Sequence, residues 1–117
     1  MKYYPIEGVF KRSFNGSVTI KVIKSSGVYD YEGIVLDGSI DWYRKQIGQV
    51  VLKFNKIGEN KYQGMYNAYH MMHSHDMGDW FEIEEARTLD SLYDGDIYML
   101  KKGKEGGTSS ATYNRVT

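Results

Sequence analysis

The sequence has no cysteine, a single proline and no excess of either charge. Without cysteine there is no disulfide framework and no thiol nucleophile, which suits a reducing compartment. Basic side chains number 15 and acidic side chains number 15, so the formal net charge is zero. Proteins that neutralise many phosphates need an excess of positive charge, and this balance therefore argues against a nucleic-acid partner.

Long apolar runs are also missing. No stretch approaches the roughly 20 apolar residues that a membrane-spanning helix needs. Met1 to Phe10 contains no apolar run of the kind that signal peptides carry. We therefore expect a cytoplasmic protein without a membrane partner. At 117 residues, the range 1–117 has room for one domain with a single core.

What the chain has in abundance favours β-structure. Its eleven tyrosines suit the pleated surface of a sheet, and its thirteen glycines suit the turns. Asn15-Gly16 between two alternating segments is a strong hairpin signal. An antiparallel meander either closes or leaves two exposed edges. We therefore predict an all-β fold of about eight strands closed into a small up-and-down barrel. The predicted strands are residues 8–14, 17–24, 28–36, 49–56, 62–69, 80–87, 97–101 and 111–116.

For two segments the sequence is compatible with more than one secondary structure. Residues 40–47 could form a short helix capped by Ser39, or an irregular crossing. Residues 80–92 alternate like a strand, but Asp79 and Glu82 also match the capping box of a helix. We favour the strand, because the two arms around the preceding loop then have similar lengths.

All three histidines fall in that loop, as His70, His73 and His75, with Asp76 beside them. Imidazole and carboxylate groups suit zinc or another first-row metal. An extended segment places His73 and His75 on one face, whereas a helical turn brings His70 and His73 together. Neither arrangement gathers all three, so we favour a polar surface loop over a metal site and expect no cofactor.

Short motifs in this chain resemble the calycin group of small β-barrels, which includes lipocalins, fatty-acid-binding proteins and avidins. The similar part is Gly8-Val9-Phe10, a tight hairpin and then Tyr31-Glu32-Gly33, about a third of the chain. Calycins open with a Gly-x-Trp strand, and a basic residue near the last strand packs across the tryptophan at the closed end. Phe10 and Arg115 stand at these places, with phenylalanine instead of tryptophan.

The resemblance implies a barrel whose interior binds a small apolar or amphipathic molecule. If Phe10 faces inward, alternation also turns Arg12 and Phe14 inward. A buried Arg12 needs a partner, either a ligand carboxylate or phosphate, or an internal glutamate such as Glu85. Alternatively, Arg12 faces solvent and the tyrosines are plain core. The expected lining residues are Phe10, Arg12, Phe14, Tyr62, Tyr66, Tyr113 and Arg115.

Two other functions compete with ligand binding. Exposed aromatic side chains would suit a protein-interaction or inhibitor module; the candidates are Trp42, Tyr43, Tyr69 and Trp80. The histidine loop would suit a small metal-dependent enzyme. Other chemistry is thin, since the chain lacks a Gly-x-Ser-x-Gly elbow and a phosphate-binding glycine loop. We expect a non-enzymatic binding protein.

Overall fold

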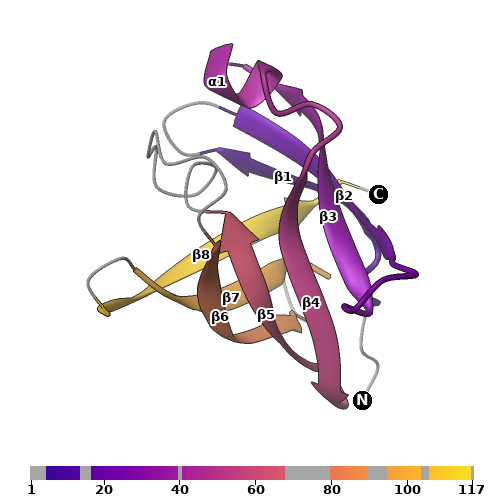
Figure 1. Cartoon of the computed structure of the whole chain (residues 1–117), viewed down its shortest axis with the longest axis vertical. Coiled ribbons are helices and arrows are strands. Elements are labelled where there is room, and N and C mark those ends of the chain that lie inside the picture. Colours follow the sequence, from indigo (N-terminus) through magenta and orange to yellow (C-terminus); the bar gives the residue numbers. More distant parts are fainter. Residues whose placement is uncertain are drawn as a thin grey trace.

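The computed structural model describes residues 5–13, 17–39, 41–67, 80–89, 95–103 and 106–116. Within these residues, the strands follow one another in chain order around a closed antiparallel barrel, and the last strand pairs with the first (Figure 1). The predicted all-β meander is therefore confirmed. The strands are β1 (Gly8–Ser13), β2 (Ser17–Lys24), β3 (Tyr31–Gly38), β4 (Val50–Gly58), β5 (Lys61–Asn67), β6 (Trp80–Thr88), β7 (Ile97–Lys102) and β8 (Thr108–Arg115).

The described parts of both ambiguous segments, residues 41–47 and 80–89, have a defined structure. A short helix, α1 (Asp41–Arg44), connects β3 to β4, so the helical alternative for residues 40–47 is correct in its first half. Residues 80–88 form β6, which pairs with β5 on one side and β7 on the other. The helical alternative for this segment is wrong.

The core consists of the inward-facing side chains of all eight strands. On β2 the buried positions alternate with more exposed ones, as period-two patterning predicts for a strand with one face in the core. Closing the sheet around these side chains removes them from water, which is the main favourable term in folding. The buried apolar strand residues are Phe10, Val18, Ile20, Val22, Val35, Val51, Leu52, Phe54, Tyr62, Tyr66, Ile83, Ala86, Ile97, Met99, Ala111 and Tyr113.

A bulge in β6 changes which of its side chains face inward. The pairing of β6 with β7 shifts register between Ile83 and Glu85. Unbroken alternation from Ile83 would turn Glu85 inward, but the bulge buries Ala86 and Thr88 and leaves Glu85 exposed. The expectation that Glu85 is an internal partner for Arg12 is therefore wrong.

One end of the barrel, which we call the Arg115 end, is held by contacts between the two closing strands. The guanidinium carbon of Arg115 lies 4.6 Å from the centroid of the Phe10 ring. Its nitrogens donate to the backbone carbonyls of Glu7 at 2.9 Å and Gly95 at 3.1 Å, and also to that of Pro5. The contact expected from the calycin resemblance is present.

The opposite end, which we call the α1 end, carries the short helix beside the end of β3 (Figure 1). A Cβ at Gly38 would lie only 2.3 Å from the Cβ of Tyr43, so glycine is what allows the helix to pack this closely. Arg44 donates to the carbonyls of Gly38 and Ser39 at 3.3 and 3.2 Å. Among the side chains described in this segment, Tyr43 and, one turn later, Gln46 are buried, each 1% exposed.

Candidate ligand-binding site

Two basic side chains occupy inward-facing positions toward the α1 end. Arg12 follows Phe10 by two residues on β1, and Lys101 follows Met99 by two residues on β7. Alternation therefore turns both cations toward the interior. Lys101 is only 7% exposed and Arg12 is partly buried. The guanidinium carbon of Arg12 lies 6.0 Å from the centroid of the Tyr113 ring.

Lys101 has polar neighbours but no acidic one among the residues described. Its Nζ donates to Ser109 Oγ at 3.0 Å and lies 5.2 Å from the centroid of the Tyr66 ring. The next residue, Lys102, is on the outer face and lies 3.5 Å from Glu82. Burial, and then the nearby charge of Arg12, lower the pKa of Lys101. Among the residues described, this inward-facing ammonium therefore has no carboxylate partner, whereas the ammonium of Lys102 has one.

Three tyrosines complete this polar group. Tyr66 and Tyr113 are fully buried, and the Tyr66 hydroxyl donates to the carbonyl of Lys102. Burial raises the pKa of Tyr113, while the positive charge of Arg12 acts in the opposite direction. Tyr43 packs on Gly38, which lies opposite Val18 on β2, and Val18 lies opposite Arg12 on β1, so the α1 tyrosine lies toward the same region as the β1 arginine. At neutral pH Tyr66 and Tyr113 are uncharged hydrogen-bonding groups close to Lys101 and Arg12, respectively.

The second buried side chain of the helical segment has unmet hydrogen-bonding capacity. The amide atoms Oε1 and Nε2 of Gln46 are both buried and have no hydrogen-bond partner. A buried polar group in this state costs about 1–3 kcal/mol relative to a satisfied one. Its amide is therefore available to a further polar group at the α1 end.

Six of the seven predicted lining residues lie in the described part of the chain, and they fall toward the two ends of the barrel. Phe14 lies outside the described residues. The three that gather toward the α1 end are Arg12, Tyr66 and Tyr113. The three nearer the Arg115 end are Phe10, Tyr62 and Arg115. Tyr62 packs edge-on against Tyr31, with ring centroids 6.0 Å apart, and this contact fills that end with aromatic rings.

Comparison with known proteins defines the fold. No family model matches the sequence, and no curated protein matches it. Protein HP1028 from the human pathogen Helicobacter pylori, described as belonging to the lipocalin family, has a similar structure with a TM-score of 0.63. The match covers 97% of this chain and 84% of that chain at 16% sequence identity. The chain has the fold of a lipocalin. At 16% sequence identity, the structural similarity shows a shared fold and does not show which ligand this chain binds.

Within this lipocalin-like barrel, sequence reasoning missed two site residues, and each had a signal. Ile97, Met99 and Lys101 alternate along one strand, so Lys101 was placed on the inward face by its sequence position. Gln46 follows Tyr43 by three residues, the spacing that brings two side chains to one side of a helical turn. Helical patterning alone does not say which side is buried, and the packing of Tyr43 on Gly38 settles this.

The aromatic residues expected at an exposed interface have a different placement. Tyr43 is buried, so its assignment to an exposed surface is wrong. Trp80 is partly buried, and the Lys53 ammonium lies 4.1 Å from the centroid of its ring. The Trp42 side chain and all of Tyr69 lie outside the described part of the chain.

The histidine loop, residues 68–79, also lies outside the described part of the chain, and with it His70, His73 and His75. Within the described ranges, no group of three histidine, cysteine, aspartate or glutamate side chains could hold a metal ion. No helix in those ranges is long and apolar enough to cross a membrane.

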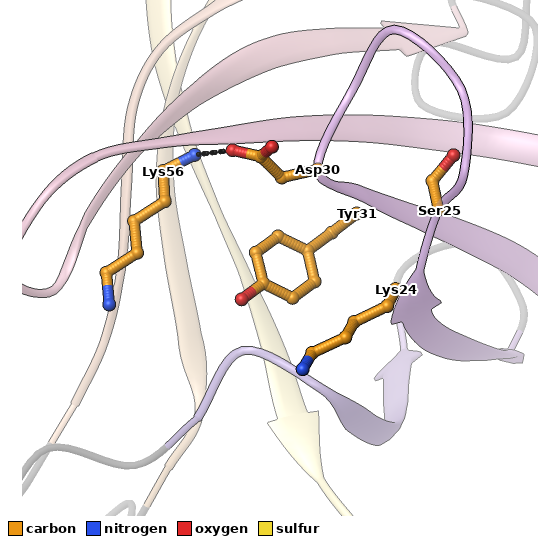
Figure 2. Close-up of a pocket in the computed structure, with 5 residues that line it drawn as sticks. All are labelled: Lys24, Ser25, Asp30, Tyr31 and Lys56. Atoms are coloured by element: carbon orange, nitrogen blue, oxygen red, sulfur yellow. Dashed lines mark hydrogen bonds between the residues drawn. The ribbon is translucent and has the colours of Figure 1, made fainter.

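A hollow lies near the Arg115 end. It has a volume of about 330 Å³ and is lined by Lys24, Ser25, Asp30, Tyr31 and Lys56. Figure 2 shows the two lysine side chains on either side of the Tyr31 ring, while Asp30 turns toward the Lys56 backbone, whose N–H donates to Oδ2 at 2.9 Å. Both lysines are exposed, so water and salt screen their charges. The buried Lys101 and the partly buried Arg12 at the α1 end therefore form the stronger candidate site for an anion.

Proposed function

We propose that this lipocalin-like barrel binds a small amphipathic anion, with the anionic group beside Lys101 and Arg12 and the apolar part among the inward-facing side chains. The observation that carries the proposal is Lys101, a 7% exposed ammonium without an ion-pair partner among the residues described. A protein whose only requirement was a stable core would place an apolar residue there.

The energetic argument concerns the charge. Moving an ammonium group out of water is costly unless another charge compensates it. A carboxylate or phosphate between Lys101 and Arg12 would provide that charge through hydrogen bonds shorter and stronger than those between neutral groups. The Ser109 and Tyr113 hydroxyls are neutral groups suited to the remaining oxygen lone pairs.

The electrostatic part of the proposal is tested with decanoate and decanol, which share an alkyl chain and differ in charge. We expect isothermal titration calorimetry to give a dissociation constant for decanoate at least about tenfold lower than for decanol, a difference of about 1.4 kcal/mol. Lys101→Met should weaken decanoate binding by about tenfold and leave decanol binding almost unchanged. The matched control is Lys102→Met, on the same strand but on the outer face, which should bind decanoate like the wild type.

Two results would contradict the proposal. One is equal affinity of the wild type and Lys101→Met for decanoate. The other is a loss of binding in Lys24→Met or Lys56→Met, because that loss would assign the anion to the exposed hollow at the Arg115 end.

A further inference from the structure

Gln46 differs from the other buried polar side chains of the described residues. Thr88 bonds to Asn60, Asp96 accepts from the Arg115 backbone N–H at 2.7 Å, and Lys101 bonds to Ser109. Gln46 is the one side chain in the described ranges whose buried polar atoms have no partner. Native proteins leave few such groups, and each calls for an explanation.

A role in the local backbone does not explain this side chain. The N–H of Gln46 donates to the carbonyl of Tyr43 at 3.0 Å, and the carbonyl of Gln46 accepts from the N–H of Gln49 at 2.9 Å. The turn after α1 is thus closed by main-chain bonds, and the side-chain amide caps neither end. A methionine or leucine would fill the same space without the unmet amide, so stability alone does not account for glutamine here.

The position of Gln46 connects it to the cations. Gln46 and Tyr43 are both buried, and both belong to the segment that follows β3 at the α1 end. Tyr43 packs on Gly38. In the sheet Gly38 lies opposite Val18, and Val18 lies opposite Arg12. The unmet amide therefore belongs to the same end of the barrel as the proposed anion site.

We infer that Gln46 is a specificity-determining residue that hydrogen-bonds an amide group of the bound molecule. A trans secondary amide carries its N–H donor and its carbonyl acceptor on opposite sides, and the Gln46 amide can accept from the first through Oε1 or donate to the second through Nε2. Together with the cations, this defines the ligand class as an acyl chain joined through an amide to a carboxylate, the chemistry of an N-acyl amino acid. The inference rests on the proposed function, because it assumes that an amphipathic anion occupies the α1 end.

The expected discrimination follows from the cost of unpaired groups. A site built to hydrogen-bond a polar group binds analogues without that group poorly, since its own buried polar atoms then stay unpaired. With methionine at position 46, an incoming amide would have to leave water without a partner. Gln46→Met should therefore weaken binding of a ligand that contains an amide, and should weaken binding of a plain fatty acid little or not at all.

The test compares N-heptanoylglycine with decanoate, two carboxylates of equal chain length that differ by the amide. Calorimetric dissociation constants are measured for the wild type, for Gln46→Met and for Gln49→Met, an exposed glutamine in the same turn as the matched control. We expect Gln46→Met to bind N-heptanoylglycine about tenfold more weakly while its decanoate affinity changes less than about twofold. Gln49→Met should keep both wild-type affinities. The melting temperature of ligand-free Gln46→Met should equal or exceed that of the wild type, because the unmet amide is gone.

The possible outcomes distinguish failure of the Gln46 inference from failure of the proposed function. If Gln46→Met changes the affinity for both ligands by the same factor, or for neither, the inference is overturned and the proposed anion site stands. A fall in the melting temperature of ligand-free Gln46→Met also overturns it, because Gln46 would then have a structural role. If the wild type binds decanoate no better than decanol, the proposed function fails and the Gln46 inference falls with it.

Discussion

Arg115 lies over the ring of Phe10, directly opposite it in the pairing of β1 with β8, and its guanidinium bonds to carbonyls from two other segments of the chain. The same residue joins the final strand to the segment before β1 and to the β6–β7 connection. Because one side chain ties the first and last strands of a closed sheet, it contributes to barrel closure as well as to local packing.

We predict that Arg115→Met destabilises the protein by about 2–4 kcal/mol, since it removes several hydrogen bonds from a charged donor and leaves carbonyl groups at the barrel end unpaired. Urea unfolding followed by circular dichroism measures the change. The control is Arg87→Met, which removes an exposed arginine and should change stability by less than about 0.5 kcal/mol. Equal effects of the two substitutions would show that Arg115 does not close the barrel.

Asn60 links the β4–β5 turn to the end of β6. Its Nδ2 donates to the Thr88 carbonyl, and its Oδ1 accepts from the Thr88 N–H, both at 2.9 Å. Its φ of 51° also lies in the left-handed region that alanine adopts at a cost. We expect Asn60→Ala to lower the free energy of unfolding by about 2–4 kcal/mol, and Asn60→Gly to lower it less, because glycine relieves the backbone strain. Glu59→Ala, at an exposed neighbour, should be close to neutral. A glycine variant less stable than the alanine variant would contradict this account.

The strands were predictable from the sequence because closure of a meander leaves alternation intact over most of its length. The orientation of Glu85 was predicted wrongly for a local reason. A bulge shifts the alternation by one residue, and the residue types at 83–86 do not identify its position. The contact of Phe10 with Arg115 could be expected only from the resemblance, since it joins opposite ends of the chain. Of the candidate site, the sequence named Arg12, Tyr66 and Tyr113, and their role in binding stays a prediction.

The burial of the Gln46 side chain could not be predicted from the sequence in the same way. Its burial depends on how a short helix packs on Gly38, which is a tertiary contact and not a pattern in the sequence. Lys101 was overlooked because a lysine next to another lysine at the end of a strand is typical of an exposed pair, although alternation separates the two onto opposite faces.

Gly64 marks the closest approach of two neighbouring strands. A Cβ at this position would lie 1.7 Å from the carbonyl oxygen of Lys53, which is backbone and cannot move aside cheaply. We predict that Gly64→Ala destabilises the barrel by about 3 kcal/mol or more, measured by thermal and urea unfolding. Gly107→Ala is the control, because nothing lies within 4 Å of a Cβ added there. If Gly64→Ala unfolds like the control, β4 and β5 do not pair in this register.

Lys101 gives the fold a stability that depends on pH. Burial and the charge of Arg12 lower the pKa of folded Lys101 below the ordinary value of 10.5. At pH values between these two pKa values, Lys101 is protonated in the unfolded chain and neutral in the folded chain. Stability therefore rises with pH across this window, and the full penalty is present below it. We predict that ligand-free Lys101→Met is about 1 kcal/mol more stable than the wild type near neutral pH, and that this advantage shrinks as the pH approaches 10.

The measurement is the free energy of unfolding in urea at several pH values up to 10. Above that value the buried tyrosines ionise on unfolding: burial raises the pKa of Tyr62, Tyr66 and Tyr113, so stability then falls with pH in both variants. Lys102→Met, which removes a lysine from the outer face of the same strand, is the control and should not stabilise the ligand-free protein near neutral pH. If Lys101→Met were less stable than the wild type at neutral pH, the ammonium would stabilise the ligand-free fold. Its burial would then be no evidence for an anion-binding site.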